Sequence, residues 1–211
     1  MIIDHTHPRY RMTWNLCGIN KYNGAYYYSK EIVERMIPNV KTDRNWITVN
    51  IQNVGCDHSI FFVHNNLHPE AYYWLRKYKD IILVCGLPET AEKMKDIGKT
   101  IYLPLSINVA EVEKYKAEKT EGTAYAGRPG KRNNRFLGIG VDYLEGIPRE
   151  ALLGKMARYR KIYAVGRTAI EAKALGCEIL PYDDRFPDPS IWQVIDNLEA
   201  ARMLQEELDK L

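Results

Sequence analysis

The residues with the most suggestive chemistry lie in the stretch Ile162 to Asp183. Val165-Gly166-Arg167-Thr168 separates a short apolar run from a run of good helix formers, and a second apolar run follows. This order predicts a strand, a glycine turn, a helix and a strand. A helix N-terminus offers free N–H groups and partial positive charge, so phosphate is a natural ligand there. Glu171, one turn into the helix, is placed to accept hydrogen bonds from a sugar hydroxyl.

A second basic group follows the predicted strand Thr123 to Ala126. The residues are Gly127-Arg128-Pro129-Gly130-Lys131-Arg132. Arginine and lysine stabilise the charge that builds up on a departing diphosphate, and they do so without a metal ion. Lys131 and Arg132 are equivalent candidates for the lysine-type contact. The alternative interpretation is an ordinary solvated turn.

His64 follows the dense apolar run Ser59 to Val63, which predicts a buried parallel strand. Ligands bind at the carboxyl ends of such strands, so His64 is a candidate contact for an acceptor or donor, and a structural role is the alternative. His58 and His68 flank it on different elements, so we expect no metal site. We interpret Asp183-Asp184 as a loop rather than a metal-binding acidic pair.

Strands and helices alternate along most of the chain. Expected strands are 46–51, 59–63, 81–85, 100–103, 123–126, 136–141, 162–165 and 178–182; expected helices are 25–36, 69–78, 88–97, 148–158 and 168–175, with a last helix capped by Asp188-Pro189-Ser190. Residues 1–23 predict loop with at most one short strand. The fold class is therefore α/β, with two small Rossmann-like doubly wound lobes facing a cleft.

The charged segment between the two sets of elements marks the predicted domain boundary. We expect an N-terminal acceptor-side lobe over 1–108, a linker over 109–121, a C-terminal donor-binding lobe over 122–189 and a C-terminal helix over 190–211. An ordinary exposed helix face is the alternative interpretation of the linker.

Composition limits the class of protein. The chain has 211 residues, 45% of them hydrophobic, and a net charge of +3. This mild positive balance fits a phosphate-bearing ligand but does not by itself imply nucleic acid. The cysteines have no C-x-x-C spacing, which argues against zinc; they are Cys17, Cys56, Cys85 and Cys177. We find no signal peptide and no run that spans a bilayer, so we expect a cytoplasmic setting.

The stretch Tyr163 to Gly176, Y-A-V-G-R-T-A-I-E-A-K-A-L-G, resembles the donor-site motif of retaining, nucleotide-sugar-dependent glycosyltransferases of the GT-B architecture. In that family a strand leads into E-G-F-G and then into a helix ending in L-E-A-M-A-x-G. The resemblance implies that Glu171 holds the nucleotide ribose and that Gly166, Arg167 and Thr168 face the donor phosphates. The family's other glutamate, which contacts the donor sugar, is replaced by Tyr163.

Other segments carry the same resemblance. Gly127-Arg128 with Lys131 or Arg132 is similar to the family's diphosphate-binding G-R and lysine. Asn23-Gly24 resembles its acceptor-side glycine loop, and Phe61 to His64 resembles its strand ending in histidine. Leu103 to Asn108 resembles the segment that crosses between lobes.

The resemblance implies transfer of a sugar from a nucleoside-diphosphate donor, for example a UDP-sugar, with retention of configuration. His64 would serve catalysis, the donor sugar would be a co-substrate, and no cofactor or metal is implied. The acceptor is open: a glycan, a protein, a small molecule or a modified DNA base. The second hypothesis is a non-catalytic nucleotide or nucleotide-sugar binding protein, because the chain is short for the family and Tyr163 replaces an acid.

Overall fold

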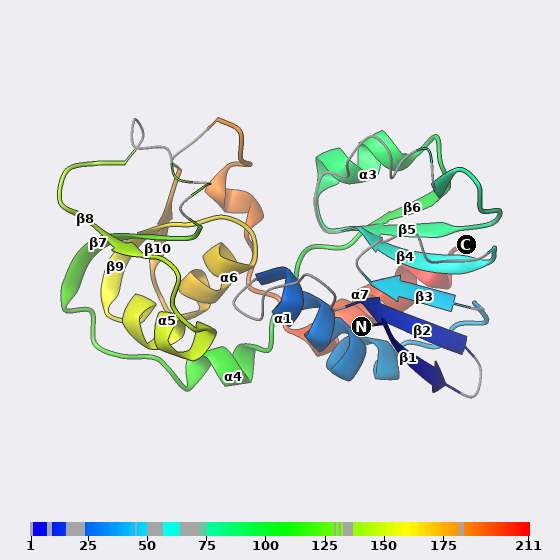
Figure 1. The fold of residues 1–211 in the computed structure, drawn as a ribbon, viewed down its shortest axis with the longest axis horizontal. Coiled ribbons are helices and arrows are strands. Elements are labelled where there is room, and N and C mark those ends of the chain that lie inside the picture. Colours follow the sequence, from blue (N-terminus) through cyan, green and yellow to red (C-terminus); the bar gives the residue numbers. More distant parts are fainter. Residues whose placement is uncertain are drawn as a thin grey trace. The chain divides into compact units, whose positions relative to one another are not determined.

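The computed structural model describes most of the chain in two α/β units (Figure 1). The described residues are 2–7, 10–15, 24–44, 46–49, 57–63, 73, 75–128, 130, 132, 137–181 and 184–211. The first unit comprises Met1–Ile19, Ser29–Leu105 and Asn197–Leu211, and the second comprises Asn20–Tyr28 and Ser106–Asp196. The α/β class with two small Rossmann-like sheets agrees with the sequence-based prediction.

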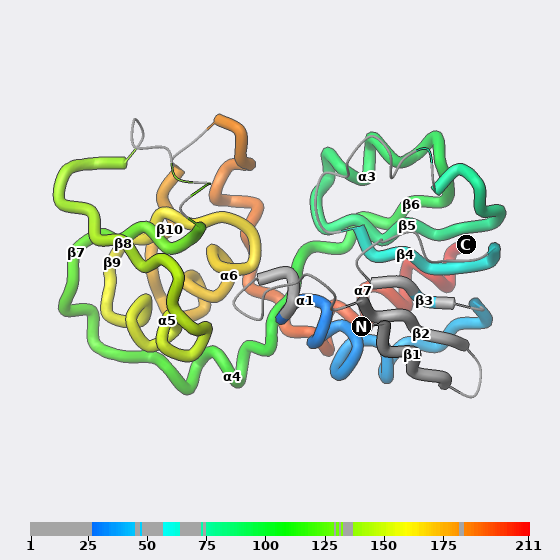
Figure 2. Tube along the Cα trace, in the orientation of Figure 1, coloured from blue at the N-terminus to red at the C-terminus, as the bar shows by residue number. Residues whose placement is uncertain are grey.

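The boundaries of the units differ from those of the predicted domains, since the second unit also takes in Asn20–Tyr28 and runs from Ser106 to Asp196. Residues 109–121 are not a separate linker, because helix α4 (Val109–Glu113) and the start of strand β7 (Glu121–Ala126) belong to the second unit. Helix α7 (Asn197–Leu208), red in Figure 2, belongs to the first unit and does not stand alone. Its apolar side supplies buried Ala200, Ala201 and Leu204 to that unit's core.

The sheet of the first unit contains six described strands in sequence order. They are β1 (Ile2–His7), β2 (Tyr10–Asn15), β3 (Trp46–Val49), β4 (Ser59–Val63), β5 (Ile82–Cys85) and β6 (Lys99–Tyr102). The β1–β2 pair is antiparallel, which corrects the expected N-terminal loop, and the other pairs are parallel. The strand order does not reverse among these strands, so the predicted doubly wound order is not seen in this sheet.

The helical segment 24–39 changes its winding, and it passes from the second unit, which includes Gly24 to Tyr28, into the first unit at Ser29. α1 (Gly24–Glu31) runs into a π-helix, η1 (Ile32–Met36), and then a 3₁₀ turn, η2 (Ile37–Asn39), where the sequence predicted one helix over 25–36. Pro38 supplies no N–H to continue an α-helix, which explains the 3₁₀ ending. α7 packs against η1 and η2, and α3 (Pro88–Met94) packs on β5 and β6.

The central strands of the first unit lie in its hydrophobic core. Every residue of β4 and β5 is buried. Alternate residues of these strands join α3 in one cluster, which comprises Phe61, Val63, Leu75, Ile81, Leu83, Cys85, Ala91 and Met94. A strand buried on both faces has no need of polar alternation, so the continuous apolar run Ser59 to Val63 is a strand as predicted. Half of the predicted helix 69–78, residues 69–72 and 74, lies outside the described residues.

The second unit is built on a parallel sheet in the order β10-β9-β7-β8. Its strands are β7 (Glu121–Ala126), β8 (Val141–Leu144), β9 (Tyr159–Tyr163) and β10 (Glu178–Leu180), and its helices include α5 (Arg149–Met156) and α6 (Arg167–Ala174). The order reverses at β7, so β7 and β9 flank a topological switch point. This is the doubly wound order that the sequence predicted for the C-terminal lobe.

Two predicted elements of the second unit are shifted. The expected strand 136–141 is observed as β8 over Val141–Leu144, because Gly140 takes a positive φ of 74° and ends a turn there. The expected last helix does not start at Asp188. The Asp188 carboxylate does accept from the Ser190 N–H at 2.8 Å, but it caps only the 3₁₀ turn η4 (Pro189–Ile191). No described helix has both the length and the apolar character needed to cross a membrane.

Candidate functional site

The candidate site lies at the carboxyl edge of the second unit's sheet. Tyr125 of β7 is the register partner of Tyr163 of β9, so the loops after these two strands emerge side by side. One loop carries Gly127 and Arg128, and the other carries Gly166, Arg167 and Thr168. Open α/β sheets bind ligands at this edge, where the strand order reverses. The structure therefore places at one edge of the sheet two segments that the sequence predicted separately as phosphate-binding.

The Gly166 turn starts helix α6. Gly166 has φ 62° and ψ −140°, a conformation that residues with a Cβ rarely adopt. Its carbonyl accepts from the N–H groups of Ala169 at 3.0 Å and Ile170 at 3.2 Å. The N–H groups of Arg167 and Thr168 precede the first intrahelical bond and have no carbonyl within the helix to bind. They are the donors that an anion would meet at this helix end.

The Gly127 loop is held by the ring of Tyr125. The Tyr125 hydroxyl donates to the Arg128 carbonyl at 2.8 Å, and a Cβ on Gly127 would lie 2.6 Å from that hydroxyl oxygen. Gly127 is thus required by close packing. The Arg128 side chain is exposed, and no ion pair holds its guanidinium among the described residues. It is therefore available to a ligand.

The other basic candidates of this loop differ in their placement. Arg132 forms an ion pair with Glu145 at 3.5 Å, and its guanidinium lies 4.7 Å from the centre of the Tyr143 ring. These contacts tie Arg132 to the end of β8. Lys131 lies outside the described residues, so the predicted choice between Lys131 and Arg132 stays open.

Glu171 lies in a buried network of ion pairs. Its Oε1 accepts from Arg167 Nε at 2.7 Å and from Arg149 Nε at 2.9 Å, and Arg149 also donates to Glu111 at 2.6 Å. Burial alone lowers the pKa of Arg149, but the charges and hydrogen bonds of Glu171 and Glu111 outweigh it and raise this pKa above its ordinary value. The Tyr27 ring lies 4.7 Å from the Arg149 guanidinium.

This network changes the expectation for Glu171. The side chain is 3% exposed, and Oε1 is shared by two guanidinium groups. A hydrogen bond from a ribose would therefore have to be accepted by Oε2. The carboxylate also stabilises the packing of Arg149 and Arg167, whether or not a ribose binds. Arg149 was not among the predicted site residues. Its signal was an arginine directly after Pro148 in the first turn of a helix, where a positive charge opposes the helix dipole and needs an acidic partner.

A pocket opens next to the Gly166 turn. Its volume is about 430 Å³, and its lining comprises Ala164, Val165, Leu180, Pro181, Asp184, Phe186, Pro187, Asp188, Pro189 and Trp192. Ala164 and Val165 directly precede Gly166, and Leu180 ends β10. The pocket is therefore at the same edge of the sheet as the candidate phosphate turn, and its volume lies within the range of small-molecule sites.

Trp192 lines this pocket and has an unpaired indole N–H among the described residues. The side chain is 4% exposed, and its Nε1–H is buried without a hydrogen-bond partner in the described part of the chain. Leaving a buried donor unpaired costs about 1–3 kcal/mol. Trp192 was not among the predicted site residues. A tryptophan two residues after Asp188-Pro189-Ser190 indicates a loop that packs back on the sheet.

The acceptor-side candidates are mostly outside the described residues. Asn23 and His64 lie there, so their predicted roles stay predictions. Gly24 is described and is the first residue of α1, in the segment Asn20–Tyr28 that belongs to the second unit. The predicted glycine loop therefore ends in a helix that starts at Gly24.

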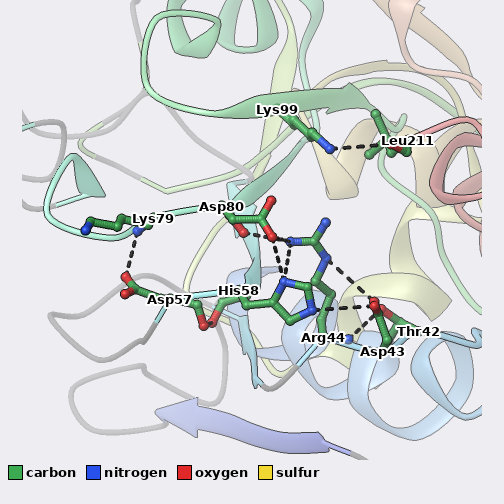
Figure 3. Close-up of polar contacts among 10 residues, drawn as sticks. Thr42, Asp43, Arg44, Asp57, His58, Lys79, Asp80, Lys99 and Leu211 are labelled. Atoms are coloured by element: carbon green, nitrogen blue, oxygen red, sulfur yellow. Dashed lines mark hydrogen bonds and ion pairs between the residues drawn. The ribbon is translucent and has the colours of Figure 1, made fainter.

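A separate polar cluster occupies the amino ends of β4 and β5 in the first unit (Figure 3). His58 Nδ1 lies 2.6 Å from Asp80 Oδ2 and its Nε2 lies 3.5 Å from Asp43 Oδ2, while Arg44 contacts the same Asp80 oxygen at 3.0 Å. The hydrogen bonds from His58 and Arg44 lower the pKa of Asp80. His58 and Asp80 both have positive φ, 57° and 49°. Because ligands bind parallel sheets at the opposite edge, we interpret this cluster as a structural clamp.

Metal binding has no support from the described side chains. No group of three or more histidine, cysteine or acidic residues that could hold a metal ion occurs among them. Cys85 and Cys177 are free and buried, and burial raises the pKa of Cys85 to about 12, which makes it unreactive. Comparisons with protein-family models, with curated proteins and with solved structures gave no match to this chain.

Proposed function

We propose that the chain is a glycosyltransferase that takes a sugar from a nucleoside-diphosphate donor with retention of configuration, and that the second unit binds the donor. The observation that carries the proposal is the register of Tyr125 and Tyr163, which sets the Arg128 loop beside the Gly166 turn at a topological switch point. The resemblance of residues 163–176 to GT-B donor sites supports the same function. We include the GT-B architecture in the proposal.

The diphosphate would be bound by two kinds of donor. The N–H groups of Arg167 and Thr168 at the start of α6 supply directional hydrogen bonds and the positive end of the helix dipole. The exposed Arg128 guanidinium supplies a full charge and a planar pair of N–H groups that match phosphate oxygens.

The chemistry needs little more than position and charge. The bond between the anomeric carbon and the diphosphate oxygen breaks, and the oxygen of an acceptor hydroxyl forms the new bond to the same carbon. The hydroxyl proton passes to the departing nucleoside diphosphate. Negative charge grows on the diphosphate as it leaves, and Arg128 with the α6 N-terminus would stabilise it. Lys131 would add a second charge on the same loop.

Binding without transfer is the second candidate. Tyr163, half-buried at the end of β9, stands where the resembled family has the glutamate that contacts the donor sugar. Glu171 forms ion pairs with Arg149 and Arg167. Both observations favour a module that holds a nucleotide or nucleotide sugar and leaves it intact.

The test is a titration calorimetry experiment followed by a turnover assay. The nucleoside diphosphates and their sugars should bind the wild-type chain, and slow release of the free nucleoside diphosphate from the sugar nucleotide should follow. Arg128→Ala should weaken diphosphate binding about tenfold, the value of one hydrogen bond to a charged group.

Arg158→Ala is the matched control, because Arg158 is exposed and lies just before β9, at the opposite edge of the same sheet. It removes the same charge and should leave binding unchanged. Binding with no diphosphate release against any acceptor favours the second candidate. If no nucleoside diphosphate binds, or if both variants lose affinity equally, the proposed function is wrong.

A further inference from the structure

The pocket beside the Gly166 turn offers a way to identify the base of the nucleotide. Val165 belongs to its wall and Gly166 follows directly, so an occupant of the pocket lies next to the candidate phosphate turn. We propose that the pocket receives the nucleotide base and selects guanine, so that the donor is a guanosine-diphosphate sugar. This inference rests on the proposed function.

The walls suit a flat ring. Phe186 and Trp192 contribute aromatic side chains to the lining, and Pro181, Pro187 and Pro189 contribute rigid apolar ones. Bases stack on aromatic side chains regardless of their identity, so this part of the pocket favours any base. Proline rings also lose little conformational freedom when a ligand is ordered against them.

The polar groups of the pocket distinguish among bases. Of its two carboxylates, Asp188 is engaged, because its Oδ1 accepts from the Ser190 N–H at 2.8 Å. Asp184 is exposed at the rim and has no hydrogen bond or ion pair among the described residues. The pocket thus offers one carboxylate without a partner among the described residues, and its lining includes Trp192, whose buried Nε1–H likewise has no partner there.

Guanine matches this pair of groups. Its N1–H and N2–H groups lie side by side and can donate to both oxygens of one carboxylate, while O6 and N7 are acceptors for an N–H. Adenine and cytosine pair one donor with a neighbouring acceptor, and uracil has one donor between two acceptors. None of these three satisfies both carboxylate oxygens of Asp184, so each would leave a polar group unpaired.

The experiment measures binding of GDP, IDP, UDP, ADP and CDP to the full chain by titration calorimetry. GDP should bind at least about tenfold more tightly than UDP, ADP or CDP. IDP differs from GDP only by the missing 2-amino group, and it should bind about tenfold more weakly than GDP. This comparison changes only the ligand, so it does not depend on any variant folding.

Variants assign the effect to the pocket. Asp184→Asn should abolish the preference for GDP over IDP, and Trp192→Phe should weaken GDP binding about fivefold to tenfold while keeping the ring. Glu178→Gln removes one acidic charge at the start of β10, outside the pocket, and should change nothing. Equal affinity for all five diphosphates, or a preference for another base, overturns the guanine assignment and leaves the proposed function standing. Failure of all five to bind overturns both.

Discussion

Tyr125 and Tyr163 are register partners on the parallel strands β7 and β9, and the two loops that follow them carry Arg128 and Gly166. Arg128 follows Tyr125 at the same sequence separation as Gly166 follows Tyr163. Equal separation along paired parallel strands brings the two loops out at the same level of the sheet. The loop that carries Arg128 and the loop that opens α6 thereby leave the same edge of the sheet, and this relation underlies the proposed donor site.

Gly166→Ala tests whether the turn needs its unusual backbone. Nothing lies within 4 Å of a Cβ at this position, so a methyl group meets no clash and the cost is the strain at φ 62° alone. We expect a loss of about 1–3 kcal/mol in the free energy of unfolding, measured by urea denaturation. Relief of the strain by rotation of the turn would instead misplace the N–H groups and weaken diphosphate binding.

Gly122→Ala is the control for this change. Gly122 lies in β7, also has nothing within 4 Å of a Cβ, and is not among the positive-φ glycines. Alanine there should leave stability unchanged or raise it slightly, because it reduces the freedom of the unfolded chain. The strain argument is wrong if the Gly166 and Gly122 variants unfold at the same urea concentration.

Gly127→Ala should destabilise the chain for a different reason, a collision. The new Cβ would lie 2.6 Å from the Tyr125 hydroxyl oxygen and 2.8 Å from its Cζ, and the Tyr125 ring is fully buried. Displacing it also breaks the hydrogen bond to the Arg128 carbonyl. Overpacking of this kind costs about 1–3 kcal/mol. Tyr125→Phe in the same chain removes the nearest atom and should recover part of the loss; strictly additive effects would contradict the collision.

Local sequence patterns were sufficient for the central strands and for the two loops of the site. Ser59 to Val63 and Ile82 to Cys85 are apolar enough to be strands in any context, and the glycine between β9 and α6 marks a turn that few other residues allow. The class of fold follows from their alternation. These features depend on residues adjacent in sequence, which is why they were predictable.

The remaining features depend on contacts between distant residues. One partner of Glu171 is Arg149, on another helix, and only the packing of α5 against α6 brings these two residues together. The order of strands in the first unit, the return of α7 to that unit and the burial of Trp192 likewise arise from tertiary contacts. No periodicity within a short window contains this information, so the buried network and the pocket emerged only from the structure.

The clamp at Asp80 predicts a pH dependence of stability. Hydrogen bonds from His58 and Arg44 lower the pKa of Asp80 below its ordinary value of 3.8. The stabilisation is therefore fully present above about pH 4 and is lost as the pH falls through the lowered pKa. Since Asp80 is about half exposed, the contribution is small, below about 1 kcal/mol.

Asp80→Asn should accordingly lower the free energy of unfolding at pH 7 and have a smaller effect at pH 2, as measured by urea denaturation at both values. Asp184→Asn, which removes a carboxylate without a partner among the described residues, is the matched control and should have no effect at either pH. A difference between wild type and Asp80→Asn that grows at low pH would contradict the direction of the shift.

Glu171→Gln separates a structural role from a ligand-binding one. The change removes the carboxylate charge that the buried guanidinium groups of Arg149 and Arg167 share, while the ion pair of Arg149 with Glu111 is kept. Breaking a buried ion pair on one side typically costs about 3–5 kcal/mol, because a charge stays buried without compensation. We expect that loss in nucleotide-free protein, measured by urea denaturation.

The control is Glu89→Gln, which removes one partner of the exposed Glu89–Lys93 pair on α3. Its effect should stay within about 1 kcal/mol, because water replaces the lost contact at a surface. If Glu171→Gln leaves the nucleotide-free protein as stable as Glu89→Gln does and weakens only nucleotide binding, the carboxylate serves the ligand and the network is secondary. If Glu171→Gln greatly lowers the free energy of unfolding without ligand, weaker nucleotide binding by Glu171 variants reflects a disturbed contact between α5 and α6. Arg128 and Gly166 are then the better positions for testing the donor site.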